Sequence, residues 1–190
     1  REYQDVAGLL QAEKNVRLGV GLHPWWVRDA ADADALIGLL PETRLVGEIG
    51  LDASARHVGT WDAQLAAFER ICAACAQTSD AAAPKVLSIH AVRSAGAVLD
   101  VLERTGAAES CRCVLHWFSG SSEELWRAVE LGCSFSLGGR ALGTRRGREY
   151  ARILPAERLL SETDLPESPN APGGASARPA SLNRGEGAGV

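Results

Sequence analysis

The sequence predicts an α/β fold built on a parallel sheet. Three observations carry this prediction: short apolar runs that end on a polar side chain, amphipathic helical stretches between those runs, and glycine or proline where one element gives way to the next. Strand and helix alternate along the whole predicted domain, and right-handed crossovers between consecutive strands of this kind build a parallel sheet. With 190 residues, of which 46% are hydrophobic, the chain has enough apolar content for the core of one domain.

The predicted helices are the stretches in which apolar residues recur at steps of three and four. The clearest covers residues 60–77, where the apolar side chains form a single stripe. A later one begins at a capping box, Ser121 with Glu124 three residues on, and ends at Gly132. The predicted helices cover residues 3–13, 31–40, 60–77, 94–104, 121–132 and 144–154.

The predicted strands are short apolar runs of the kind found in buried parallel sheets. They cover residues 16–22, 45–48, 86–90, 111–116, 133–137 and 159–164. The run that starts at Leu45 is expected to end on Glu48, because Gly50 lets the chain turn sharply there. A buried glutamate is costly unless a cation or strong donors pair with it, so Glu48 needs such a partner.

Four of these strands deliver a metal-binding side chain at the same end: Glu48, His90, His116 and Asp164. The carboxyl ends of the strands of a parallel barrel meet at one face, where active sites are built from strand tips. Two imidazoles and two carboxylates at that face predict a site for hard-to-borderline divalent metal ions.

Charge and cysteine content narrow the class of protein. A net charge of −4 and a pI near 5.6 argue against a protein held to nucleic acid by bulk charge. Five cysteines without a secretory signal favour reduced thiols, with a zinc site of Cys72-x-x-Cys75 and Cys111-x-Cys113 as the alternative. No apolar run approaches the roughly 20 residues of a membrane span, so we expect a cytoplasmic protein that binds no membrane.

Three stretches differ from the rest in composition. Five arginines crowd residues 140–152, where they contact phosphates or form a solvated face. From residue 167 onward Gly, Ala, Ser and Pro predominate, so we expect a domain over residues 1–166 and a disordered tail over residues 167–190. The chain starts at Arg1 and contains no Met, from which we expect an N-terminal truncation.

Five motifs at strand–helix spacing carry a resemblance to a known family. They are Gly21-Leu22-His23-Pro24, Gly47-Glu48-Ile49-Gly50-Leu51-Asp52, Ile89-His90, His116-Trp117-Phe118-Ser119-Gly120 and Thr163-Asp164-x-Pro166. In this order they resemble the TatD family of metal-dependent deoxyribonucleases. Residues 94–100 together with residues 116–120 are similar to the TatD-like nuclease of Qat anti-phage cassettes, which implies antiviral defence and partner proteins of the cassette.

The resemblance implies a (β/α)₈ TIM barrel of the metal-dependent hydrolase type, here incomplete, with about six of the strands. It implies hydrolysis of phosphodiester bonds in DNA, in the 3′ to 5′ direction, with two divalent ions: Mg²⁺, or alternatively Mn²⁺ or Zn²⁺. Glu48 would bridge the ions, His90 and His116 would complete one site, and Asp164 would belong to the other. The family's remaining ligands come from an Asp-x-His-x-His motif that this chain lacks, and we expect that it lies upstream of Arg1 or was lost.

The roles at the site follow from the chemistry that paired metals support. Such ions lower the pKa of a bound water, neutralise the phosphate and stabilise the leaving oxygen. Glu48 and Asp164 are the predicted catalytic residues, with Asp164 orienting or deprotonating the water. His23, Arg93 and Ser119 are the predicted substrate contacts. Arg93 stands one residue beyond the position at which the family usually carries arginine.

Other interpretations stay open. Trp25 and Trp26 stack on bases or pack over the barrel mouth. The same barrel and ligands serve small-molecule amide or lactone hydrolases, many of which have a carboxylated lysine, whereas Glu48 stands in that place here and the only lysines are Lys14 and Lys85. The other alternative is a non-catalytic subunit of a multiprotein assembly, because a barrel without two strands exposes apolar edges.

Overall fold

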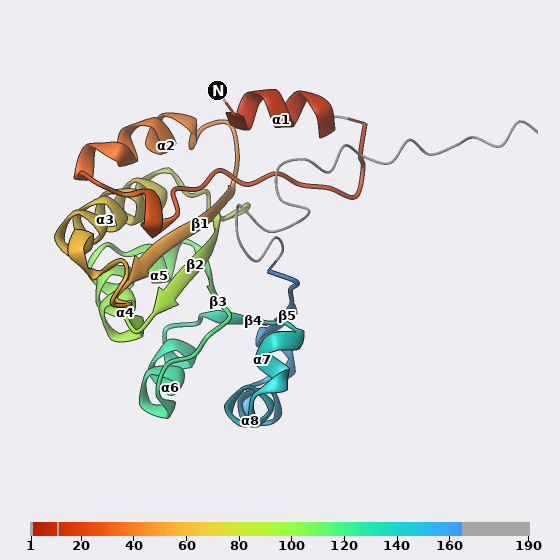
Figure 1. The fold of residues 1–190 in the computed structure, drawn as a ribbon. Helices are drawn as coiled ribbons and strands as arrows, with labels where there is room; N and C mark the ends of the chain where they lie inside the picture. The colour runs from red at the N-terminus through yellow and green to blue at the C-terminus, as the bar shows by residue number, and fades with distance from the viewer. Residues whose placement is uncertain (1, 11, 165–190) are drawn as a thin grey trace, which may run out of the picture.

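The computed structural model describes residues 2–10 and 12–164, which form a parallel sheet with helices packed along it (Figure 1). The strands are β1 (Leu45–Asp52), β2 (Val86–Val92), β3 (Arg112–His116), β4 (Ser134–Leu137) and β5 (Leu159–Ser161). They lie side by side in chain order, and each neighbouring pair is parallel. This order is that of the wall of a (β/α) barrel, so the predicted class is confirmed. The predicted tail over residues 167–190 lies outside the described residues.

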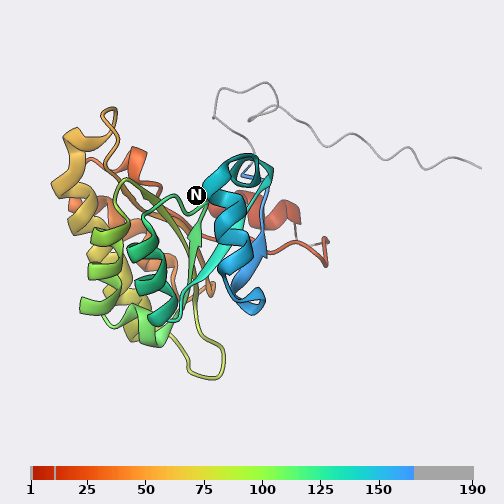
Figure 2. The same ribbon diagram turned by 90° about the horizontal axis from the view of Figure 1, so that it is seen from below.

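Helices pack along the sheet (Figure 1). The α-helices are α1 (Glu2–Leu10), α2 (Ala33–Leu39), α3 (Trp61–Thr78), α4 (Ala95–Arg104), α5 (Ala107–Ser110), α6 (Ser122–Glu130), α7 (Gly139–Gly143) and α8 (Arg145–Ile153). The 3₁₀ helices are η1 (Pro24–Trp26), η2 (Ala30–Asp32), η3 (Val58–Thr60) and η4 (Ala156–Arg158). Figure 2 shows α3, α4 and α6 in a row along the strands. Within this row α4 contacts both α3 and α6.

The hydrophobic core lies between the sheet and these helices. Its largest fully buried side chains come from both layers: Phe68, Phe135, Leu40, Ile49, Leu51, Ile71, Leu87, Ile89, Leu99, Leu102, Leu115 and Leu125. Burying one such side chain contributes about 2 kcal/mol. The packed layer fixes the strands and therefore the positions of the side chains at their carboxyl ends.

The prediction of a full strand over residues 16–22 is wrong. Within the described residues, this segment contributes a single bridge to the sheet, from Val20 to Val46. The Val20 N–H donates to the Leu45 carbonyl at 3.0 Å, and the Val20 carbonyl accepts from the Gly47 N–H at 2.7 Å. The chain then enters η1, which starts with a proline that has no N–H to continue a ladder. The described sheet therefore has five strands rather than six.

The sequence predicts a strand that ends at Glu48, whereas β1 continues to Asp52. Gly50 explains the difference, because its φ is 137° and a Cβ there would lie 2.1 Å from the His90 carbonyl oxygen. Glycine is needed here for the close approach of β1 to β2, not for a turn. The register between these strands shifts around Glu48, and irregularities of this kind re-aim side chains next to active sites.

Most other predicted elements are confirmed with small changes at their ends. The helices predicted over residues 60–77, 94–104 and 144–154 are α3, α4 and α8. The predicted helix over residues 3–13 ends earlier, at Leu10. Helices α5 and α7 are too short for a periodic pattern to reveal. No helix within the described ranges is long and apolar enough to cross a membrane.

The predicted capping box at the start of α6 is confirmed, and it also ties α6 to α4. The Ser121 Oγ accepts the Glu124 N–H at 3.2 Å, and Oε2 of Glu124 accepts the Ser121 N–H at 2.7 Å. The second carboxylate oxygen of Glu124 accepts the Gly96 N–H at 2.8 Å. The helices that follow β2 and β3 are thus joined beside the ends of those strands.

Candidate metal centre

The four predicted ligands converge at the carboxyl-end face of the sheet. Glu48 comes from the irregular part of β1, His90 from β2 and His116 from the end of β3, while Asp164 follows β5 by three residues. His90 Nδ1 lies 2.9 Å from Glu48 Oε1. His116 Nε2 lies 3.7 Å from the same oxygen and 3.2 Å from Asp164 Oδ1. The structure brings all four side chains together, and their roles stay predictions.

Two overlapping groups of side chains place their ligand atoms within 4.8 Å of one another. One contains His23, Glu48 and His90, and the other contains Glu48, His116 and Asp164. Glu48 belongs to both groups. The geometry groups His116 with Asp164 rather than with His90, so the predicted division of ligands between two ions stays a prediction.

His90 is held between two carboxylates, one of which the sequence reasoning missed. Its Nε2 lies 3.2 Å from Oδ2 of Asp52, which is 2% exposed, and its Nδ1 faces Glu48. The Trp25 Nε1–H donates to the same Asp52 oxygen at 2.6 Å. A carboxylate behind a histidine fixes the orientation and tautomer of a metal-binding imidazole. Asp52 lies in the quoted Gly47–Asp52 motif, so the signal was present but carried no assigned role.

The pKa values around His90 reflect this arrangement. Burial raises the pKa of Glu48, but the hydrogen bond with His90 and the charge of His116 outweigh it and lower the pKa. Burial lowers the pKa of His90, but its bonds to Glu48 and Asp52 outweigh that effect and raise it. A proton on Nδ1 competes with a cation for that nitrogen, which couples metal affinity to pH.

His116 has an equivalent support in Glu162, which the sequence reasoning also missed. The His116 Nδ1 lies 2.5 Å from Glu162 Oε2, and the Ser136 hydroxyl donates to that oxygen at 2.5 Å. Because Nδ1 is engaged, Nε2 is the nitrogen that faces Glu48 and Asp164. Glu162 lies two residues before Asp164, in the segment that follows β5.

His23, predicted as a substrate contact, lies beside Glu48 with its Nε2 3.6 Å from Oε1. Its Nδ1 accepts the Trp25 N–H at 3.3 Å and so caps η1. Burial lowers the pKa of His23 to about 4, so the ring is neutral at pH 7. A neutral imidazole that accepts at Nδ1 carries its proton at Nε2. His23 therefore presents a donor to the centre, which suits a phosphate contact better than metal ligation.

The donor set fits a divalent metal ion. Imidazole nitrogens and carboxylate oxygens converge from separate strands, and the two supporting acids orient the rings. All five cysteines are free and buried. Within the described residues, none of them belongs to a group of three or more potential ligands, so the alternative zinc site is not supported.

A family model described as "TatD related DNase" matches residues 1–184. This chain belongs to the TatD family. The resemblance carried by the sequence motifs is therefore confirmed, and the fold is that of an incomplete TatD-type TIM barrel.

Curated TatD proteins support the same assignment. The chain is 37% identical over 154 residues to "3'-5' ssDNA/RNA exonuclease TatD" of Edwardsiella piscicida, an alignment that covers 77% of this chain and 56% of that protein. It is 32% identical over 172 residues to the protein of the same name from Citrobacter rodentium, covering 87% of this chain and 63% of that protein. The chain thus spans about three fifths of the length of these relatives.

Solved TatD structures share the fold. A hydrolase TatD family protein from Entamoeba histolytica superposes with a TM-score of 0.68 at 21% identity, covering 86% of this chain and 56% of that one. YJJV, a TatD homologue from Escherichia coli, superposes with a TM-score of 0.64 at 25% identity, covering 86% of this chain and 63% of that one.

A cleft of about 710 Å³ opens over the candidate metal centre. The predicted substrate contacts His23 and Ser119 line this cleft. Val92, which stands where the family usually carries arginine, lines it as well. Arg93 is exposed and is not among the lining residues, so its predicted contact gains no support. Arg140, from the arginine-rich segment, lines the cleft instead.

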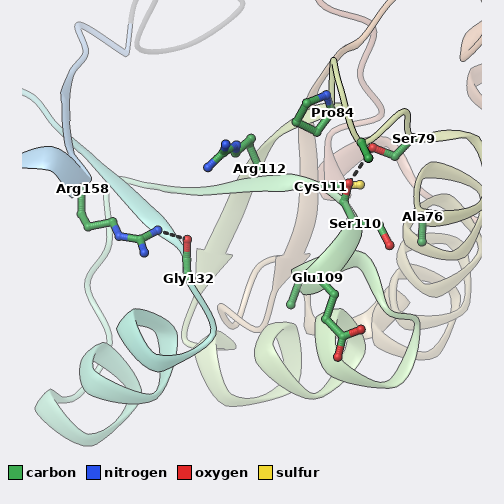
Figure 3. A pocket seen from close by; sticks show the side chains of 11 residues that line it. Ala76, Ser79, Pro84, Glu109, Ser110, Cys111, Arg112, Gly132 and Arg158 are labelled. Carbon is green, nitrogen blue, oxygen red and sulfur yellow. Dashed lines mark hydrogen bonds between the residues drawn. The ribbon is translucent and has the colours of Figure 1, made fainter.

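A second hollow, of about 570 Å³, lies at the opposite ends of the strands (Figure 3). Its lining includes Arg112, the first residue of β3, and Arg158, whose guanidinium donates to the Gly132 carbonyl. Ser79 Oγ donates to the Ser110 carbonyl at 2.6 Å beside it. Chemistry in barrels of this class is located at the carboxyl-end face, so we assign the TatD site to the first cleft.

Proposed function

We propose that this chain is a metal-dependent nuclease that hydrolyses phosphodiester bonds in DNA. The observation that carries the proposal is the pair of supported histidines: His90 on Asp52 and His116 on Glu162, both turned toward Glu48. Bound divalent ions supply an acidified water and neutralise charge on the phosphate. The names of the TatD relatives refer to single-stranded substrates and 3′ to 5′ polarity, and we extend the proposal to both for this chain.

Each residue at the centre has a proposed role. Glu48, His90, His116 and Asp164 hold the ions. Asp164 orients the attacking water and accepts its proton. His23 donates its Nε2 proton to a phosphate oxygen, which the distance of 3.6 Å to Glu48 places next to the ligands.

Mg²⁺ is the proposed ion, with Mn²⁺ as the alternative that the carboxylates suit and Zn²⁺ as the alternative that the imidazoles suit. We place the protein in the cytoplasm. A role in an anti-phage cassette with partner proteins is the part of the proposal that rests on sequence motifs alone.

The alternative of a small-molecule hydrolase would be marked by a carboxylated lysine at the metal site, and Lys85 does not lie there. Lys85 is 6% exposed, and its ammonium donates to the carbonyls of Leu40 at 2.7 Å and Thr43 at 3.2 Å. Lys85 directly precedes the first residue of β2, so its ammonium lies at the end of the sheet opposite to Glu48. Lys85 is therefore not available as a carboxylated bridge, and Glu48 occupies that place.

The test is cleavage of a 5′-labelled single-stranded oligonucleotide by the purified chain with Mg²⁺, with Mn²⁺ or with EDTA. We expect progressively shortened products with either ion and none with EDTA. Glu48→Gln should abolish cleavage, and Glu69→Gln should not, because Glu69 pairs with Arg104 on the helical surface. Absence of metal-dependent cleavage in the wild-type chain, or equal cleavage by Glu48→Gln, would overturn the proposal.

A further inference from the structure

Two adjacent tryptophans at the cleft differ in how they are held. Trp25 stacks on His57 with an interplanar angle of 8°, and its Nε1–H donates to Asp52 at 2.6 Å. It is thereby fixed as a support of the metal centre. Trp26 lines the same cleft and is 60% exposed. An indole left this exposed beside a candidate active site presents a flat apolar face to whatever enters.

A third tryptophan forms another part of the wall. Trp117 directly follows His116 and lines the cleft. Its φ is 38°, a left-handed conformation that bulky residues rarely adopt and that folds retain mainly at ligand sites. The guanidinium carbon of Arg140 lies 4.7 Å from the Trp117 ring centroid. The cleft thus combines two indole surfaces with a positive charge, next to four candidate metal ligands.

We propose that Trp26 and Trp117, with Arg140 over the Trp117 ring, form a nucleobase subsite that stacks the unpaired base next to the phosphate being cleaved. The inference rests on the proposed nuclease function and adds the source of its preference for single strands. Every base has a π face, so stacking is tolerant of sequence. A base in a duplex has to leave its partner and its neighbours before it can stack on the protein, at a cost in free energy that is smallest for an already unpaired base.

The charge of the chain supports this assignment. With a net charge of −4, these 190 residues do not attract a polyanion by bulk charge. Binding must therefore come from local contacts, and stacking on aromatic side chains is one contact that this cleft provides in addition to its metal ligands and polar donors. A volume of about 710 Å³ is in the range that accommodates a ligand of nucleotide size.

The experiment compares binding of two fluorescein-labelled oligothymidylates, with Ca²⁺ in place of Mg²⁺. One is intact, and the other lacks the base of its 3′-terminal nucleotide. The wild-type chain should bind the intact probe about tenfold more tightly. Trp26→Ala should remove that difference by weakening binding of the intact probe alone, and Trp26→Phe should restore most of it.

The matched control is Trp126→Ala, because Trp126 on α6 is 44% exposed and is absent from the cleft lining. It should bind both probes as the wild type does. Equal binding of the two probes by the wild type, or an equal effect of Trp26→Ala on both, would overturn the subsite. If the wild type cleaves single strands and Trp26→Ala keeps the probe difference, the subsite fails and the nuclease stands. If the wild type neither binds nor cleaves them, both fail.

Discussion

The Nδ1 of His116 lies 2.5 Å from Oε2 of Glu162, so the imidazole has one nitrogen occupied and the other turned toward Glu48 and Asp164. The Ser136 hydroxyl bonds the same Glu162 oxygen, which holds the carboxylate in place. The orientation of His116 is therefore set by a residue that does not itself face the metal site.

Removing this support should weaken metal binding without unfolding the protein. We expect Glu162→Gln to lower the affinity for Mn²⁺ about 10- to 100-fold, because an amide cannot supply the negative charge that orients the imidazole. Isothermal titration calorimetry measures this directly. Glu157→Gln, an exposed position in η4, is the control and should bind Mn²⁺ as the wild type does. Equal affinities for Glu162→Gln and the wild type would show that His116 is oriented by its packing alone.

Asp52 should make stability depend on pH in the acid range. Burial raises its pKa, but hydrogen bonds from Ser54 and Trp25 outweigh this and hold the pKa at about 2, below the ordinary 3.8. The ionised form is thus favoured in the fold, and its stabilisation is present above pH 3.8 and is lost as the pH falls toward 2. Urea unfolding in EDTA should show a smaller loss over this window for Asp52→Asn than for the wild type. Parallel pH profiles would contradict the assignment.

His23 should also make stability fall as the pH decreases, but over a higher pH range than Asp52. The pKa of His23 is lowered from 6.5 to about 4, chiefly by burial. Between these two pH values the ring is protonated in the unfolded chain and neutral in the folded protein. Stability then falls as the pH drops from 6.5 to 4, by about 3 kcal/mol. His23→Gln keeps a side-chain donor and removes this titration. The difference in unfolding free energy between the wild type and His23→Gln should therefore change between pH 6.5 and pH 4. A constant difference over this range would show that His23 titrates normally.

Gly50 should tolerate no side chain. A Cβ would lie 2.1 Å from the His90 carbonyl oxygen at a φ of 137°, so Gly50→Ala must separate β1 from β2. We expect a loss of about 3 kcal/mol or more in thermal or urea unfolding. Gly38→Ala in α2 is the matched control, because nothing lies within 4 Å of its Cβ position. It should stabilise the helix by about 0.5–1 kcal/mol. A mild effect at Gly50 would mean that the two strands can shift apart at little cost.

The sequence predicted the helices and the convergence of the four ligands because these depend on local patterns. Each ligand ends or follows an apolar run, and parallel strands in chain order bring such ends together. The roles of Asp52 and Glu162 depend instead on contacts across 38 and 46 residues. Those contacts follow from strand register, which the shift around Glu48 alters in a way that no local pattern encodes.

Two wrong predictions share one cause. Glycine was interpreted as a turn signal at Gly50, and residues 16–22 were interpreted as a strand from their apolar content. In the fold, Gly50 serves the approach of two backbones, and Val20 alone in its segment pairs with the described sheet. Whether a backbone approaches another closely is a tertiary property, which one sequence does not reveal. The left-handed φ of Trp117 was hidden for the same reason.

The burial of Lys85 makes the chain its own reporter of unfolding. Of the two lysines, Lys14 is exposed and Lys85 is 6% exposed, with its ammonium bonded to two carbonyls. An amine-reactive acylating reagent should therefore modify Lys14 in the native protein and reach Lys85 only when the end of the sheet opens. The ratio of the two modified peptides, read by mass spectrometry, would count open molecules at equilibrium without any denaturant.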